Sequence, residues 1–261
     1  MGHNRLGRLP RTRRWQEVVD LLDLPSASVA AIAAAVVDAA EHRLRGLAND
    51  EALAYAFWTL ARVTWAARQD SFLQELSWLG VRDWPEPSAI GLISGTVQHV
   101  RSRVAELEAR NDFAEFAALA VARSLTETVG REGPGLFSST AEDAQRAFRA
   151  YSTPAKFGEL ARLFFADFMS RSLKSFVDRE LSNHVGSGKV IRSVEGSQDF
   201  LNALELHTRQ AARIIEEFSE GWYSLHNWES SGDIGLKEAQ RFVAQALRKL
   251  RAELKQGATA A

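Results

Sequence analysis

The stretch SAIGLISGTVQHVRSRVAEL, residues 88–107, carries the clearest structural signal in the sequence. Its large apolar side chains recur at alternating steps of three and four residues, which places them along one side of an α-helix. They are Ile90, Ile93, Val97, Val100, Val104 and Leu107. The spacing predicts a helix with a heptad seam, and Ser88 is a residue type that commonly caps the first turn of a helix.

Apolar residues recur at helical spacing through most of residues 13–256, so the sequence predicts an all-α fold of about ten helices. Ser28 precedes one such segment, and Asn49 and Asp50 together give the start signal of another. Ser139 and Glu142 have the spacing of a capping box. Residues 219–235 show no helical period and are expected to form an irregular loop.

Glycine and proline suggest where the chain divides. We expect a multi-helix bundle whose C-terminal half resembles a four-helix bundle, with the two halves packed as one unit. The expected parts are a basic N-terminal arm (1–14), a helical first half (15–130), a linker (131–139), a helical second half (140–256) and a disordered tail (257–261).

Composition excludes several classes of protein. The chain has no cysteine, which rules out disulfides and thiolate metal sites, and its 32 basic and 33 acidic residues nearly balance. The most apolar run, residues 29–37, is too short to cross a bilayer, so we expect a cytoplasmic protein without a membrane partner. Abundant alanine, with far more arginine than lysine, suggests a bacterial source of high G+C content.

The N-terminal arm is the one strongly charged segment. It contains five arginines and no acidic residue, whereas the following helical half is acidic. The arginines are Arg5, Arg8, Arg11, Arg13 and Arg14. Such an arm can bind nucleic-acid phosphates, but it can equally pair with the chain's own carboxylates. We favour pairing within the chain, and nucleic-acid binding is kept as an alternative.

One short motif suggests an enzyme. The letters RELSNH at 179–184 place Arg179 five positions before His184. This pattern resembles the motif of HEPN-family ribonucleases, whose domain is a helical bundle. The resemblance implies that His184 takes part in chemistry at the ribose hydroxyl and phosphate, and that Arg179 holds the phosphate. A HEPN-like ribonuclease is therefore an alternative function.

Other familiar sites are not found. Residues 186–189 read GSGK, but Asn183 and Val190 stand where a P-loop needs glycine and a hydroxyl residue, so no nucleotide site is predicted. The six histidines do not pair at metal-binding spacing. We expect neither a metal nor a cofactor.

Seven tryptophans in the chain are the more informative feature. Trp222, Tyr223 and Trp228 fall in the expected loop and form the candidate binding residues, because aromatic side chains dominate protein interfaces. Together with the heptad seam, they suggest a non-enzymatic interaction subunit, an adaptor or assembly component of a bacterial complex. Its partner would be another protein or a second copy of the chain.

Overall fold

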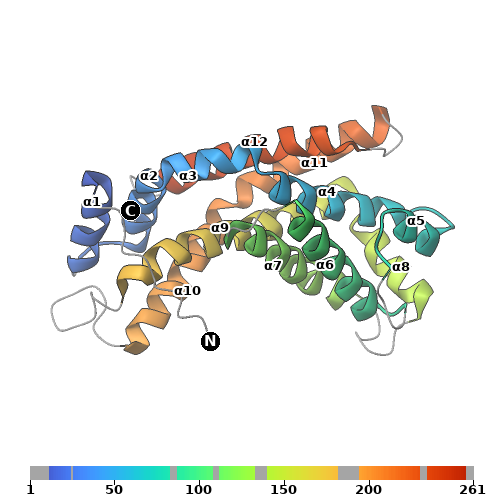
Figure 1. Ribbon diagram of the computed structural model, residues 1–261, viewed down its shortest axis with the longest axis horizontal. Helices are drawn as coiled ribbons and strands as arrows, with labels where there is room; N and C mark the ends of the chain where they lie inside the picture. Colours follow the sequence, from blue (N-terminus) through green and yellow to red (C-terminus); the bar gives the residue numbers. More distant parts are fainter. Residues whose placement is uncertain are drawn as a thin grey trace.

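The computed structural model describes residues 12–24, 26–82, 87–107, 112–132, 140–181, 194–229 and 234–256; for 179–181, 194–196 and 227–229 it describes the backbone alone. Every regular element in these ranges is a helix, which confirms the all-α fold (Figure 1). In chain order they are α1 (Arg13–Asp23), α2 (Val29–Ala39), α3 (Glu41–Gly46), η1 (Leu47–Asn49), α4 (Glu51–Ala66), α5 (Phe72–Trp78), α6 (Ala89–Glu106), α7 (Asp112–Glu127), η2 (Val129–Arg131), α8 (Ala141–Ala150), α9 (Pro154–Leu181), α10 (Val194–Ala211), α11 (Arg213–Glu229) and α12 (Leu236–Gln256).

Side-chain caps fix the start of several helices. The predicted starts of α2, α4 and α6 are confirmed: Ser28, Asp50 and Ser88 each accept a hydrogen bond from a backbone N–H in the first turn. Of the two residues predicted at the start of α4, Asp50 is the cap and Asn49 ends η1. The contact from the N–H of Leu53 to Asp50 is the shortest, at 2.8 Å. Each cap satisfies an N–H group that has no partner within the helix.

The capping box of α8 differs by one residue from the prediction. Thr140 caps the helix, and its hydroxyl accepts from the N–H of Asp143 while the Asp143 carboxylate accepts from the N–H of Thr140. The expected pair of Ser139 and Glu142 was therefore wrong. The sequence offers both pairs one position apart, and the helix begins one residue later than the prediction.

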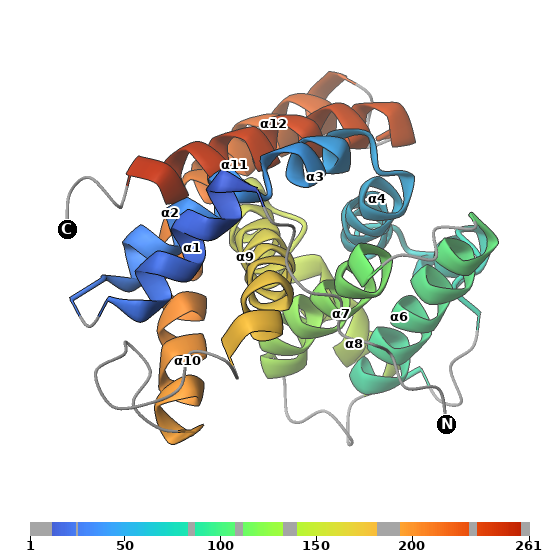
Figure 2. The same cartoon turned by 60° about the vertical axis from the view of Figure 1, so that its left-hand side comes forward.

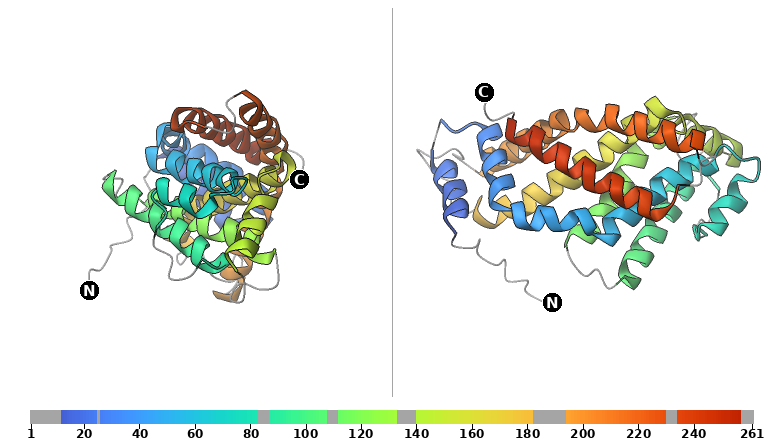
Figure 3. Two further views of the ribbon diagram at one scale, coloured as in Figure 1. Left: turned by 90° about the vertical axis from the view of Figure 1, so that its right-hand side faces the viewer. Right: turned by 90° about the horizontal axis from the view of Figure 1, so that it is seen from above.

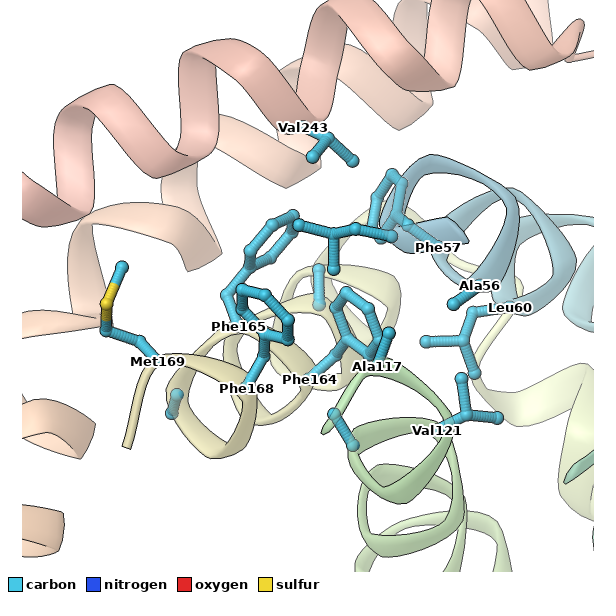
Figure 4. Packing of buried hydrophobic residues seen from close by; sticks show 14 of the residues in the cluster. Ala56, Phe57, Leu60, Ala117, Val121, Phe164, Phe165, Phe168, Met169 and Val243 are labelled. Carbon is cyan, nitrogen blue, oxygen red and sulfur yellow. The ribbon is translucent and has the colours of Figure 1, made fainter. Parts of the chain in front are cut away.

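The core gathers around α9, which lies between α7 and α10 (Figure 2) and also packs along α11. Its phenylalanines point in several directions, as expected for a helix that is apolar on more than one face. Phe164 and Phe165 are fully buried and meet Phe57 of α4 at ring distances of 5.9 and 5.3 Å. Figure 4 shows these rings between α4, α7 and α12, so distant parts of the sequence share one apolar cluster.

The heptad seam of α6 is used within the chain. Ile93, Val97, Val100 and Val104 are buried, and the helix packs against α4, α7 and α8. A seam that is already covered by three helices of its own chain does not offer a free face to a partner. The buried residues of the seam therefore contribute to the fold and do not form an interaction surface.

The predicted loop at 219–235 was wrong over most of its length. Helix α11 continues through Glu229, and α12 begins at Leu236. Aromatic residues and glycine, such as Gly221, have low intrinsic helix propensity, and the helical spacing of apolar residues is weak here. The sequence therefore carries no clear signal for a helix. Tertiary packing decides the outcome, because Ile215, Ser219 and Tyr223 are buried at steps of four residues against the core.

The second half contains α8 to α12 rather than the four helices expected. Residues 201–218, whose apolar side chains recur at helical spacing, belong to two helices that meet at Ala212. The N–H of Ile215 bonds to the carbonyl of Ala212, three residues back, so the chain tightens and turns there. This turn allows α10 to contact α2 as well as α9, while α11 runs along α9 and α12.

Candidate protein-binding groove

The three aromatic residues proposed for binding lie on α11, and the structure separates their roles. Tyr223 is fully buried and stacks on Phe157 of α9, with ring centroids 4.0 Å apart. Trp222 is half-buried. The backbone of Trp228 belongs to α11, but its side chain lies outside the described residues. Only Trp222 is therefore placed at a described surface.

Trp222 lies at the boundary between the core and that surface. Its ring lies 4.6 Å from Phe242 of α12 and 5.6 Å from Phe57 of α4. His226 packs on it at 4.8 Å, and Nδ1 of His226 lies 2.8 Å from the Trp222 carbonyl oxygen, within hydrogen-bonding distance. The indole is thus held in one orientation by rings from its own helix and from two others.

A groove of about 540 Å³ runs beside Trp222, between α11 and α12. The two helices lie next to each other in the view from above (Figure 3). The groove is lined by Glu217, Phe218, Gly221, Trp222, Leu225, His226, Glu238, Arg241, Phe242 and Gln245. Its floor is formed by Phe218 and Phe242, which stack at 4.9 Å, and Leu225 is 51% exposed at its edge.

Charged side chains surround this apolar floor. Glu217 and Arg241 are exposed and Glu238 is half-buried, and none of the three makes an ion pair with another described residue. Ionised side chains without an internal partner remain available to a partner molecule. The groove therefore combines an apolar centre with charges at its rim, as protein-binding surfaces commonly do.

Two glycines on neighbouring helices differ in an informative way. A Cβ atom at Gly158 of α9 would lie 2.7 Å from the carbonyl oxygen of Glu216, so this glycine lets α9 and α11 approach closely. At Gly221, apart from the backbone of its own helix and its two chain neighbours, no described atom lies within 4 Å of the corresponding position. A glycine inside a helix costs about 1 kcal/mol relative to alanine, and at Gly221 no contact within the described chain explains that cost.

The connection before α12 is held by a second tryptophan. The indole N–H of Trp58 on α4 donates a 2.7 Å hydrogen bond to the carbonyl of Ile234, which is buried. This bond fixes the chain just before the first turn of α12. The α12 side of the groove is therefore anchored to α4 rather than carried on a free end.

The structure does not describe the side chains proposed for the ribonuclease alternative, Arg179 and His184. Arg179 lies in the last turns of α9, but its side chain and the whole of His184 lie outside the described residues. Their separation is untested, and the ribonuclease remains a prediction. Upstream in the same helix, burial raises the pKa of Asp178, although Lys174 opposes this effect.

The basic arm is described only from Thr12 onward. Arg13 lies 3.4 Å from Glu17, and Arg14 lies 3.2 Å from Glu41 and 3.1 Å from the carbonyl of Asp38. These two arginines therefore lie against acidic residues and backbone of the chain itself. The other three arginines, residues 133–139 of the expected linker (131–139) and the tail at 257–261 lie outside the described residues, whereas Arg131 belongs to η2.

Histidines and carboxylates do not gather into a metal centre in the described ranges, where no group of three or more is placed to share an ion. His99 instead bonds to the hydroxyl of Tyr55 at 2.6 Å, and burial lowers the pKa of His207. None of the described helices has the length and apolar character needed to span a membrane.

Comparison with known proteins finds no relative of this chain. No family model, no characterised protein and no solved structure matches this chain. The groove is therefore assigned from geometry alone. The sequence pointed to Trp222 but missed Phe218, Gly221 and Leu225, although Phe218, Trp222 and Leu225 have the i, i+4, i+7 spacing of one helix face.

Proposed function

We propose that this chain is a non-enzymatic interaction subunit, an adaptor or assembly component of a bacterial complex, and that its α11–α12 groove binds a helix of a partner protein. The observation that carries the proposal is Gly221. It lies midway along α11, it lines the groove, and no described atom occupies the space beside it. A glycine of this kind allows a partner backbone to approach, as Gly158 does for α11 within the chain.

The chemistry of the groove specifies its occupant. Phe218, Trp222 and Leu225 suit a partner helix with apolar side chains at positions i, i+3 or i+4, and i+7. Because Glu217 and Glu238 have no ionic partner among the described residues, a basic residue beside that apolar stripe would complement the rim. Trp222 is the expected centre of the binding energy, since it is rigidly held and already partly desolvated.

The proposal is tested by selecting helical peptides from a displayed library on the full-length protein. We expect the retained peptides to share an apolar i, i+4, i+7 stripe and a basic residue. Fluorescence anisotropy of a synthesised peptide should then show at least about tenfold weaker binding to Gly221→Leu, because the new side chain fills the approach path. Leu225→Asp, at an exposed position, should weaken binding similarly.

Gly46→Leu is the matched control. Gly46 is also a helical glycine, and no described atom lies within 4 Å of the position that a Cβ would take, but it lies at the end of α3 and outside the groove. It should bind the peptide like wild type, and all variants should keep the helical circular dichroism signal. Equal peptide affinity of Gly221→Leu and wild type would rule out the groove. If the wild type dimerises and Gly221→Leu alone abolishes the dimer, the occupant is a second copy of the chain.

A further inference from the structure

A second concave surface lies where α8 and the start of α9 meet the end of α4, and Ser224 of α11 also lines it. It is open to solvent, has a volume of about 730 Å³ and is lined by Arg68, Arg146, Arg149, Ala150, Ser152, Thr153, Pro154 and Ser224. Three of these eight residues are arginines, and no acidic residue is among them. The cavity volume lies within the range of small-molecule sites.

The arginines of this pocket are poorly neutralised. Arg146 bonds to Asp143 on the outer side of α8 at 3.0 Å. Arg68 and Arg149 are exposed and form no ion pair with any residue that the structure describes. Three guanidinium groups around one cavity repel one another, and an anion between them removes that repulsion.

Hydrogen bonds hold two of the arginines at the pocket. The side-chain amide of Gln145 on α8 donates to the carbonyls of Ala67 and Gln69, at 3.2 and 2.8 Å, on either side of Arg68. The hydroxyl of Ser152 donates to the carbonyl of Arg149 at 2.7 Å. The chain just after α4 is therefore fastened to the middle of α8, and Arg68 and Arg149 line a common space.

The surroundings suit an oxyanion. Helix α9 starts at Pro154 in the pocket wall and contributes the partial positive charge of a long helix N-terminus. The hydroxyls of Thr153 and of Ser224 from α11 are further lining groups that can donate hydrogen bonds. These groups add to the arginine cluster, which is the feature that selects an anion.

We infer that this pocket binds a small phosphate-bearing molecule, with Arg68 and Arg149 holding phosphate oxygens. Planar guanidinium groups match phosphate oxygens in pairs, and a phosphate or diphosphate carries enough charge to neutralise more than one arginine. A lone carboxylate would leave most of the positive charge uncompensated. The remaining volume, beside Ala150 and Pro154, accommodates the organic part of the ligand. This site is separate from the α11–α12 groove.

The test uses isothermal titration of the full-length protein with inorganic pyrophosphate at constant ionic strength. Wild type should bind, and Arg68→Gln and Arg149→Gln should each weaken binding at least about tenfold, since each loses a charge-assisted hydrogen bond. Arg213→Gln, which changes an exposed arginine outside the pocket, is the matched control and should bind like wild type. Circular dichroism confirms that each variant is folded.

Two results would overturn the inference. One is pyrophosphate binding that is unchanged in Arg68→Gln and Arg149→Gln, or absent from wild type. The other is tight, steeply salt-dependent binding of single-stranded RNA that these variants abolish, with no saturable binding of pyrophosphate. That second result would assign the arginines to a nucleic-acid surface instead.

Discussion

Two regions of the molecule gather arginines, and they differ in whether the arginines have acidic partners. The first, here called the α7–α9–α10 network, ties three helices together. Its members are Arg123, Glu127, Asp167, Arg171, Lys174, Glu205 and Arg209. The second is the arginine pocket of α4, α8 and α9, in which Arg68 and Arg149 have no ion pair within the described chain.

Arg123 shows what pairing achieves. Its guanidinium bonds to one carboxylate from each of three helices, Glu127, Asp167 and Glu205, at 2.7, 2.8 and 2.6 Å. Burial alone would lower the pKa of Arg123, but these hydrogen bonds raise it. Asp167 is almost fully buried and forms ion pairs with both Arg123 and Arg171. Identical side chains thus hold the fold together in the network and remain available for a ligand in the pocket.

The largest expected effect lies in the network. Arg123→Met keeps the aliphatic stem but removes the guanidinium that bridges Glu127, Asp167 and Glu205, so three charge-assisted hydrogen bonds are lost. Each carboxylate then keeps only its remaining basic partners from Arg171, Lys174 and Arg209. We expect a loss of about 3 kcal/mol in the free energy of unfolding, at the lower end for broken buried pairs because Arg123 is partly exposed. Urea denaturation followed by circular dichroism measures the loss.

Arg101→Met provides the control for that measurement. Arg101 and Glu115 form a pair at 2.7 Å, but both side chains are largely exposed, at 42% and 53%. Exposed pairs contribute little, so the loss should stay below about 1 kcal/mol. Equal losses from Arg123→Met and Arg101→Met would show that the network has no special role in stability.

Acid should weaken the network next. Burial alone would raise the pKa of Glu205, but hydrogen bonds from Lys174 and Arg123 lower it to about 2 from its ordinary 4.5. The folded state therefore holds the ionised form more strongly than the unfolded state does. This contribution is complete above the unfolded value of about 4.5 and is lost as pH falls toward about 2.

We expect Glu205 to account for about 2 kcal/mol of the stability lost on acidification through this range, allowing for its coupling to neighbouring charges. Urea midpoints of wild type and Glu205→Gln, compared across the range, isolate its share from that of other carboxyls. The variant should show the shallower dependence on pH. Parallel curves for the two proteins would assign the acid sensitivity to other groups.

A smaller effect is expected where the arginine pocket is fastened together. Gln145→Ala removes the two hydrogen bonds to Ala67 and Gln69, which should cost about 1 kcal/mol of stability. Because Arg68 is then less firmly placed, pyrophosphate affinity should fall several-fold. Gln16→Ala, which removes an exposed hydrogen bond to Asp20, is the control and should change neither quantity. Unchanged pyrophosphate affinity in Gln145→Ala would show that the hydrogen bonds of Gln145 do not help to position Arg68 for binding.

How far the sequence could predict these features depends on whether their causes are local. Ser28, Asp50 and Ser88 cap helices whose first turns follow directly in the sequence, so their roles could be read from spacing. Trp222 and Tyr223 belong to a helix that the sequence disguised, because rings from α4, α9 and α12 stabilise it more than its own propensities do. Such contacts between distant segments leave no signal in a local window.

The two arginine regions also depend on contacts between segments that are distant in the sequence. Arg68 lies far along the chain from Arg149, and Gln145 brings them together through hydrogen bonds to backbone carbonyls that any residue type would offer. The partners of Arg123 are likewise distributed over three helices. The spacing of these residues in the sequence does not show which arginine has three carboxylate partners and which has none among the described residues. Only the folded structure shows which arginines stabilise the fold and which form a candidate binding site.

The smallest expected effect on stability is that of Arg149→Met, which contrasts most clearly with that of Arg123→Met. Arg149→Met should change the free energy of unfolding by less than about 0.5 kcal/mol, because Arg149 is exposed and without an ion pair in the described chain. Relief of the repulsion from Arg68 and Arg146 opposes the loss of a favourable charge in the last turn of α8, so the two effects partly cancel. With pyrophosphate at ten times its dissociation constant, wild type should gain about 1.4 kcal/mol from ligand binding. Arg149→Met should gain far less at that concentration. A loss of stability near that of Arg123→Met would mean that Arg149 supports the fold, and the contrast between the two regions would fail.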